Sequence, residues 1–276
     1  MASDLTTTEP TDIDKPNVSP VDRPAVPEPP AAKNPHRLRF TFLYLLLAVV
    51  LGVAVAGAAL YATDTIRPSA AWSSWTPGGG GLGRANQIAA HVAKQYHLPS
   101  GEQLVEVFAK APSVSPADQQ IPLHYIVVQR ANSNDPAIPI SSGDTVQYSL
   151  CGLGNSCAIA KGTPSVQRGT LVRREILELA LYTFKYMGGV KNVVAFMPPT
   201  PGSTPKYVVF LQRSDLDKYL HQPLATTLSS KTPLASAITR TDQQTVDATT
   251  ESKVYQFGLS QAQNGDAVLV LTPIAA

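Results

Sequence analysis

The sequence predicts an extracytoplasmic α+β domain with a mainly antiparallel sheet, preceded by one transmembrane helix and a disordered N-terminal tail. Three observations lead to this fold class. Residues 40–62 form an apolar run of 23 residues without a charge, and the residues before this run are rich in proline. After the run, helical and strand patterns come in groups rather than in strict alternation, which is typical of α+β proteins.

Composition limits the function of the chain before any motif is considered. The 276 residues carry 22 basic and 20 acidic side chains, which gives a formal net charge of +2. A protein that binds nucleic acid mainly through charge has clustered Lys and Arg and a strongly basic domain, so we expect no nucleic-acid partner. Only two Cys are present. They are too few for a disulfide scaffold or for a four-ligand structural zinc site.

Residues 1–39 are predicted to form a disordered cytoplasmic tail. Eight prolines interrupt this segment, and it has hardly any aliphatic periodicity. Such a segment buries too little apolar surface to offset the entropy that it would lose on ordering. We expect this tail only to set the orientation of the chain in the membrane. The alternatives are that it is a polyproline ligand for a partner protein, or that it is a phosphorylation switch at Thr6, Thr7 and Thr8.

Residues 40–62 are predicted to be a transmembrane helix that anchors the chain in the lipid bilayer. A helix of this length reaches about 34 Å, and the hydrocarbon core is about 30 Å thick. A cleaved signal peptide is the alternative, but its apolar core has about 7–15 residues. Lys33, Arg37 and Arg39 precede the run, and only Arg67 follows it closely. The positive-inside rule therefore predicts a plasma-membrane protein with a cytoplasmic N-terminus and an extracytoplasmic C-terminal domain.

The predicted span and the segment behind it carry two further signals. Ala48, Gly52 and Ala56 form a row of small residues that predicts weak self-association of two such helices. Residues 63–83 have no periodic pattern and contain Trp72, Trp75 and four consecutive glycines. We expect a flexible tether here, with both tryptophans at the outer membrane interface. The glycine spacing matches nucleotide-binding loops, but the preceding strand and the Lys-Ser/Thr pair are missing, so we expect no cofactor.

Residues 84–276 are predicted to form the extracytoplasmic domain. Apolar residues at helical spacing predict a helix over residues 85–96 and a longer one over residues 170–187, on which Arg174, Glu178 and Lys185 stay in water. A short helix is expected to begin at Ser214. Apolar runs bounded by Pro, Gly, Asn and Ser predict strands over residues 104–109, 123–129, 145–151, 190–197 and 207–212.

The C-terminus predicts a β-hairpin. Tyr255, Phe257 and Leu259 alternate with polar or small neighbours, and Asn264-Gly265 has the preference of a type I′ turn. Residues 267–272 are expected to form the second strand. Because residues 267–271 are apolar throughout, we expect this strand to be covered on both faces.

Cys151 and Cys157 are predicted to form a disulfide. Two glycines among the five residues between them allow a tight reversal of the chain, which brings the Cβ atoms within bonding range. An oxidising exterior favours the bond. A redox-active pair is the alternative, but the spacing is not C-x-x-C and no helix N-terminus is evident there.

The sequence predicts no catalytic, cofactor or metal site. The nucleophile motif G-x-S-x-G does not occur, and Ser203 and Lys206 have S-x-x-K spacing only within a proline-rich loop. None of the histidines beyond the predicted span has Cys, Asp or Glu neighbours in a metal-binding pattern. These histidines are His91, His97, His124 and His221.

Several segments look similar to uncharacterised single-pass envelope proteins of actinobacteria. These segments are WSSWTPGGGG, IAAHVAKQYHLP and the long helix followed by VVAFMPP and YVVFLQRSDL. The resemblance implies an envelope protein and brings no activity with it.

We therefore expect a single-pass membrane-anchored envelope protein whose outer domain binds a protein partner or acts as a scaffold, without catalysis. The alternatives are a membrane-tethered cell-envelope hydrolase, with a site assembled from residues distant in sequence, and a divisome-like assembly protein of the same layout. A pocket with convergent ionisable groups would favour the enzyme. A flat apolar patch or an open sheet edge would favour binding.

Overall fold

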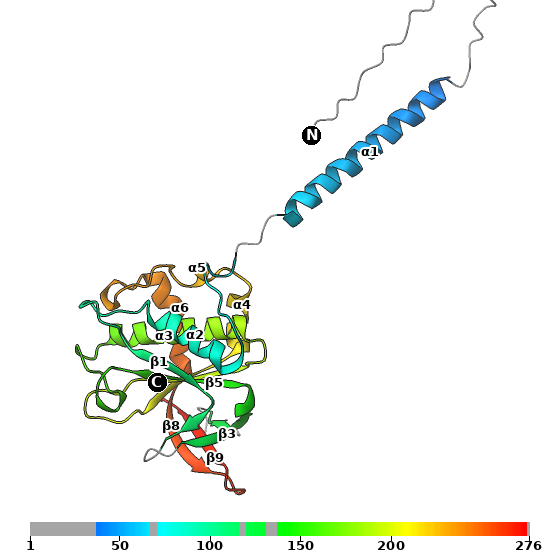
Figure 1. Ribbon diagram of the computed structural model, residues 1–276. Coiled ribbons are helices and arrows are strands. Elements are labelled where there is room, and N and C mark those ends of the chain that lie inside the picture. The colour runs from blue at the N-terminus through cyan, green and yellow to red at the C-terminus, as the bar shows by residue number, and fades with distance from the viewer. Residues whose placement is uncertain (1–36, 67–70, 116–119, 131–136, 275–276) are drawn as a thin grey trace, which may run out of the picture. The chain divides into compact units, whose positions relative to one another are not determined.

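The computed structural model describes residues 37–66, 71–115, 120–130 and 137–274. The chain divides into two compact units, Met1–Arg67 and Pro68–Ala276. The first unit contains helix α1, Arg37–Ile66, and the second contains all the described strands (Figure 1). The predicted disordered tail, residues 1–39, lies outside the described residues except for its last three, which belong to α1.

Helix α1 covers the segment predicted to cross the membrane. Among the described residues, no helix has both the length and the apolar character that a membrane crossing requires. This finding overturns the predicted transmembrane helix, and with it the single-pass anchoring and the plasma-membrane location. Ala48, Gly52 and Ala56 are exposed on α1, and their self-association stays a prediction.

The predicted tether, residues 63–83, belongs in large part to the globular unit. Trp72 is only 8% exposed, and its indole Nε1 donates a hydrogen bond of 3.2 Å to the carbonyl of Tyr219. Trp75 stacks on His91 of helix α2, Gly81–Ala93. The two tryptophans therefore pack on the protein itself, and helix α2 begins inside the segment expected to be flexible.

Nine strands of the described residues form one sheet, in the order β1-β5-β6-β7-β8-β9-β3-β2 with β4 paired to β3. The strands are β1 Glu106–Lys110, β2 Ser113–Val114, β3 Ile121–Val128, β4 Ile138–Ser141, β5 Thr145–Cys151, β6 Asn192–Phe196, β7 Tyr207–Gln212, β8 Val254–Gln261 and β9 Ala267–Pro273.

The sheet is mainly antiparallel, as predicted, but two of its eight pairings are parallel. The pairs β5–β6 and β3–β9 run parallel, and the other pairings are antiparallel. Parallel neighbours need a long crossover, and helix α3, Val166–Tyr186, supplies it between β5 and β6. The globular unit therefore has a mixed α/β fold in place of an α+β domain behind a membrane helix.

The chain itself holds the two ends of the strand order together. Strands β1 and β2 lie at opposite ends of that order, yet only Ala111 and Pro112 separate them in sequence. Leu123 of β3 donates its N–H to the Pro112 carbonyl at 2.9 Å, and Ser113 donates its N–H to Oε1 of Gln147 on β5 at 2.8 Å. The sheet therefore curls into a nearly closed barrel.

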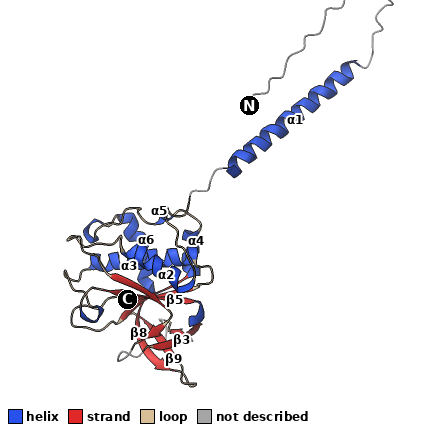
Figure 2. Cartoon of the chain, viewed as in Figure 1, coloured by secondary structure: helices blue, strands red, loops and turns tan. Residues whose placement is uncertain are grey.

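The helices of the globular unit gather on one side of the strands (Figure 2). Besides α2 and α3 they are α4 Arg213–Leu220, α5 Leu224–Thr227 and α6 Arg240–Thr250. Short 3-10 turns lie at Ser142–Asp144, Asn155–Cys157, Ala235–Ala237 and Glu251–Lys253.

Strands β6 and β7 contribute to two separate cores. Val193 and Val209 belong to the core between the sheet and the helices, whereas Val194, Val208 and Phe210 belong to the core inside the barrel. Successive side chains of a strand point to opposite faces, so both faces of these strands are buried. This burial explains why their sequences are apolar without alternation.

The C-terminal hairpin forms as predicted, but its turn is of another type. Five residues, 262–266, connect β8 and β9, and of these only Gly265 has a left-handed φ, of +89°. A type I′ turn needs positive φ at both central residues. Asn264 instead accepts a hydrogen bond of 3.1 Å through its Oδ1 from the N–H of Asp266.

The hairpin offers a matched test of the barrel core. Leu259 and Leu269 are paired across β8 and β9, but Leu269 is fully buried and Leu259 is 50% exposed. We expect Leu269→Ala to lower the free energy of unfolding by about 2–5 kcal/mol, because it leaves a cavity. Leu259→Ala should change it by less than about 0.5 kcal/mol. Urea unfolding of both variants measures the difference, and equal losses would show that the barrel interior is not a packed core.

Candidate functional site

One mouth of the barrel opens into a pocket of about 310 Å³. Strands β1, β2, β5, β6 and β8 and the loop after β6 form its walls. Pockets of this kind, apolar with a few polar groups and set in the mouth of a barrel, are typical ligand sites. The apolar part of the lining includes Val114, Phe196, Met197, Pro205, Phe257 and Leu259.

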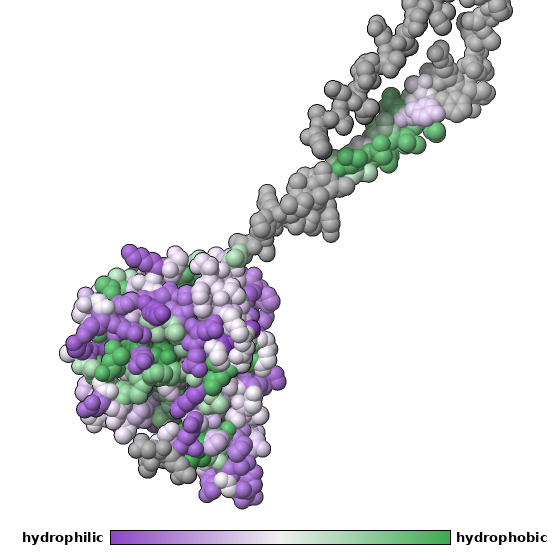
Figure 3. Space-filling model, viewed as in Figure 1, coloured by the Kyte–Doolittle hydropathy of each residue, from purple (hydrophilic) through white to green (hydrophobic). Residues whose placement is uncertain are grey.

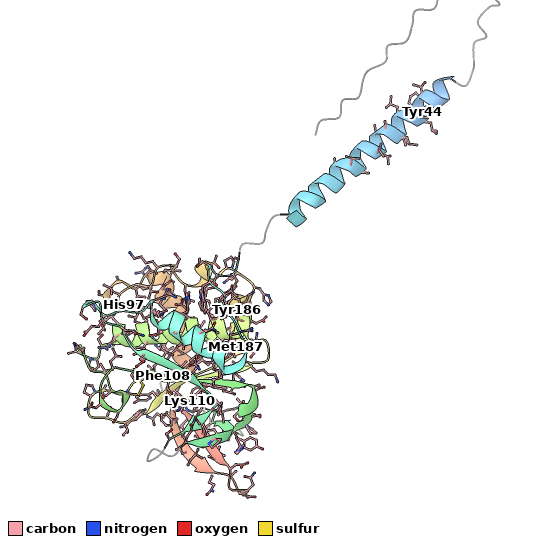
Figure 4. The ribbon with its side chains drawn as sticks, in the orientation of Figure 1. Tyr44, His97, Phe108, Lys110, Tyr186 and Met187 are labelled. Carbon is pink, nitrogen blue, oxygen red and sulfur yellow. A yellow bond between two sulfur atoms is a disulfide. The ribbon has the colours of Figure 1, made fainter. Side chains whose placement is uncertain are left out.

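Lys110 is the one charged residue among the described residues that line this pocket. It follows Phe108 by two positions on β1, so both side chains lie on the same face of the strand. Phe108 is 46% exposed, and burial lowers the pKa of the Lys110 ammonium group. Figure 3 shows apolar surface on the same face of the globular unit on which Figure 4 labels these two residues. The barrel mouth therefore combines apolar surface with one partly desolvated cation.

The predicted disulfide is present and forms part of the pocket rim. Cys151 and Cys157 are bonded with their Cα atoms 4.2 Å apart, and both line the pocket. The N–H of Gly152 donates to the carbonyl of Cys157 at 2.9 Å. A Cβ on Gly152 would lie 2.6 Å from the Cα of Ile159. Only glycine fits at this position, because the backbone of Gly152 lies directly against the backbone of Ile159. This close approach is what allows the predicted tight reversal of the chain.

Helix α3 carries a buried charge network that the helical pattern does not reveal. The Nε of Arg174 donates to Oδ2 of Asp242 on α6 at 2.9 Å, and its Nη1 lies 3.4 Å from Oε2 of Glu178. The hydroxyl of Tyr96 donates to the same Glu178 oxygen at 2.6 Å. The N–H of Ser229 donates to Oδ1 of Asp242 at 3.0 Å. The prediction that Arg174 and Glu178 stay in water is wrong, because α2 and α6 cover this side of α3.

Glu175 lies beside this network without a partner. Its side chain is fully buried, and neither carboxyl oxygen has a hydrogen bond among the described residues. Burial, and next to it the charge of Glu178, raises the pKa of the Glu175 carboxyl well above its ordinary value. Burial also raises the pKa of Glu178, against the opposing effects of the Tyr96 hydrogen bond and of Arg174. Burial therefore favours the protonated form of the Glu175 carboxyl.

The four histidines beyond α1 are dispersed over the globular unit. His91 stacks on Trp75 with ring centroids 3.8 Å apart, and the backbone of His97 pairs with that of Gln103. His124 and His221 each lie beside one aspartate, at 3.2 and 3.5 Å. In the described part of the chain, no serine is hydrogen-bonded to a histidine, and no group of three His, Cys, Asp or Glu residues is placed to hold a metal ion.

Comparisons with protein-family models, with curated proteins and with solved structures give no match to this chain. The resemblance to single-pass envelope proteins of actinobacteria is not tested by these comparisons and stays a prediction.

We expect the disulfide to stabilise the globular unit. Replacing Cys151 and Cys157 together by Ser should lower the free energy of unfolding by about 2.4 kcal/mol, the value that the chain-entropy model gives for so short a loop. Denaturant unfolding of the oxidised protein and of the double variant measures this loss. Peptide mapping without reductant should find the two cysteines linked, and freely alkylated thiols in the native protein would contradict the bond.

Glu175 should make stability depend on pH. Because its pKa is raised in the folded state, its unfavourable contribution is absent below the ordinary value of 4.5 and grows as the pH rises towards the folded value. We expect Glu175→Met to raise the free energy of unfolding by about 1–3 kcal/mol at pH 8, and by less at pH 4.

The exposed Glu106 of β1 provides the control for this variant. Glu106→Met should leave the free energy of unfolding unchanged to within about 0.5 kcal/mol at either pH. Urea unfolding at pH 4, 6 and 8 measures both variants. A stabilisation by Glu175→Met that is the same at all three pH values would contradict a raised pKa.

Proposed function

We propose that the globular unit is a non-catalytic binding domain and that the pocket at its barrel mouth takes a small amphiphilic ligand with one anionic group. The observation that carries the proposal is the combination of an apolar lining with Lys110 as its single described charge. The proposal keeps the expectation of binding without catalysis and assigns it to a defined place in the fold.

The size and lining of the pocket support an apolar ligand. A volume of about 310 Å³ lies at the lower end of the range for small-molecule sites, about 300–1,000 Å³. Phe257 and Leu259 of β8 and Phe196 of β6 offer aromatic and aliphatic surface. Each Å² of apolar surface removed from water favours binding by about 25 cal/mol.

Lys110 supports an anionic group on that ligand. Its ammonium group loses part of its hydration in the folded protein, and none of the described carboxylates forms an ion pair with it. A ligand carboxylate or phosphate would supply the missing counter-charge through a charge-assisted hydrogen bond. The hydroxyl groups of Ser115 and Ser149 in the same lining are further donors.

The disulfide supports an oxidising, extracellular setting for this function, since such bonds persist there. The hydrolase alternative lacks the serine–histidine or cysteine–histidine pair that nucleophilic catalysis would use, as far as the described residues go. The binding of a protein partner and a divisome-like role stay predictions, and the ligand proposed for the barrel mouth does not depend on either.

Calorimetric titration with octanoate and with octanol tests the proposal. We expect octanoate to bind at least about ten-fold more tightly than octanol to the native protein. Lys110→Met should remove this preference and leave octanol binding unchanged. Lys161→Met removes a lysine that is 65% exposed in its pair with Glu102, and it should retain the preference.

Two results would overturn the proposal. One is the absence of saturable binding of octanoate to the folded native protein. The other is an octanoate preference that Lys110→Met leaves intact, because the anion would then be recognised elsewhere.

A further inference from the structure

A second pocket, of about 310 Å³, lies on the helical side of the sheet, separate from the barrel mouth. It is bounded by the segment before α2, by α2 and α3, and by the segment around α5. Its lining includes the aromatic side chains of Trp72, His91 and Tyr182 and the carboxyl group of Glu178. This lining differs from that of the barrel mouth, because its charged group is an acid.

Aromatic rings in this region pack against one another in fixed orientations. The ring of Trp72 packs edge-on against the ring of Tyr182, with the ring centroids 5.2 Å apart. It packs in the same way against Tyr186, which Figure 4 labels, at a centroid distance of 5.7 Å. Trp75 stacks on His91 at 3.8 Å and meets Tyr182 at 5.5 Å. The rings therefore form a rigid aromatic wall for the pocket rather than separate flexible side chains.

Glu178 brings an incompletely bonded carboxyl oxygen to this wall. Its side chain is 4% exposed and lines the pocket. Oε2 accepts from Tyr96 and lies near Arg174, whereas Oε1 has no hydrogen-bond partner among the described residues. Oε1 is not among the fully enclosed side-chain atoms without a partner, so it stays accessible from the pocket, where a carboxylate attracts a cation more strongly than it does in bulk water.

The charges around Glu178 leave an excess of acid. Two carboxyls, those of Glu178 and Asp242, share the single guanidinium of Arg174 in this network. Burial, and next to it Lys94, lowers the pKa of His91 and so disfavours the charged form of its imidazole. Lys185 lies over the ring of Trp72, with its Nζ 5.8 Å from the ring centroid, but it does not line the pocket, and none of the described lining residues is a lysine or an arginine.

We infer that this pocket binds a small soluble compound with a methylated ammonium group, held between the rings of Trp72 and Tyr182 and the carboxylate of Glu178. Aromatic rings attract such cations through their negative faces, and a methylated ammonium needs few hydrogen-bond acceptors. One free carboxylate oxygen and an aromatic wall suit this group better than a primary ammonium, which carries three donors. The site is independent of the ligand proposed for the barrel mouth.

The chain contains an internal reporter for this site. Its two tryptophans, Trp72 and Trp75, both belong to the aromatic wall, so intrinsic tryptophan emission responds to this pocket and not to the barrel mouth. Choline chloride serves as the probe. Its uncharged isostere 3,3-dimethylbutan-1-ol and sodium chloride at equal ionic strength are the ligand controls, all at pH 8.

We expect a saturable change of tryptophan emission with choline, no such change with sodium chloride, and binding of the alcohol that is weaker by at least about ten-fold. This comparison needs no variant. Glu178→Gln keeps the shape of the side chain and should weaken choline binding by at least about ten-fold. Glu175→Gln changes the neighbouring buried acid outside the pocket lining and should stay within about three-fold of the native protein.

Thermal unfolding followed by circular dichroism shows whether each variant is folded. If Glu178→Gln does not fold, the comparison of choline with its isostere decides. Equal binding of choline and the alcohol, or no saturable response to choline, overturns the inference. A folded Glu178→Gln protein with native affinity overturns it as well, as does an equal loss in the Glu175→Gln protein.

Discussion

The connection between β1 and β2 sets the shape of the globular unit. Two residues, Ala111 and Pro112, join the strands that end the sheet on either side, so the sheet has to curl until its ends meet. The hydrogen bond from the Ser113 N–H to Gln147 fixes the distance between the two ends. Curling produces an inner face that is filled by aliphatic and aromatic side chains, and the pocket with Lys110 lies at one mouth of this barrel. The candidate binding site is thus a consequence of a short connection rather than of any sequence motif.

Helix α3 is the second constraint, because it packs on the outer face of the same strands. Leu171, Ile176 and Leu181 are fully buried between the sheet and the helices. The other side of α3 is covered by α2 and α6, and there the helix presents Arg174 and Glu178. Covering a charged side of a helix requires partners for each charge, and Tyr96 and Asp242 provide them from either flank. The two pockets therefore lie on opposite faces of one layer of strands, each lined by a different chemistry.

Sequence patterns predict the local elements of this fold well and their burial poorly. Strands β5 and β7 have the predicted bounds, because their apolar runs end at residues that leave the sheet. Helix α3 begins at Val166, four residues earlier than its apolar stripe suggests, since the Ser165 hydroxyl caps it by accepting from the N–H of Arg168 at 3.1 Å. Helix α6 is missed because it is polar, with Val246 as its one fully buried aliphatic residue.

Parallel pairing and the burial of charges depend on contacts between distant segments, and no spacing along the chain encodes them. Of the candidate sites, only the disulfide has a local signature, whereas Lys110, Glu178 and Trp72 become site residues through the tertiary fold alone.

The free-energy cost of the buried acids gives a physical reason to regard the helical side as functional. In a natural protein the residue at each position usually suits its surroundings in the fold, and the exceptions occur most often at functional sites. A leucine or methionine at Glu175 would fit the apolar surroundings of α3 without an unpaired polar group, yet a carboxyl stands there with both oxygens unbonded. Of the two carboxyl oxygens of Glu178, Oε2 accepts a hydrogen bond from Tyr96, and helix α3 places this residue at the wall of a pocket. Burial alone would favour replacing both acids, and of the two only Glu178 lines the pocket, where its carboxyl lies beside Trp72 and Tyr182. A cation in that pocket would then offset part of this cost each time it binds.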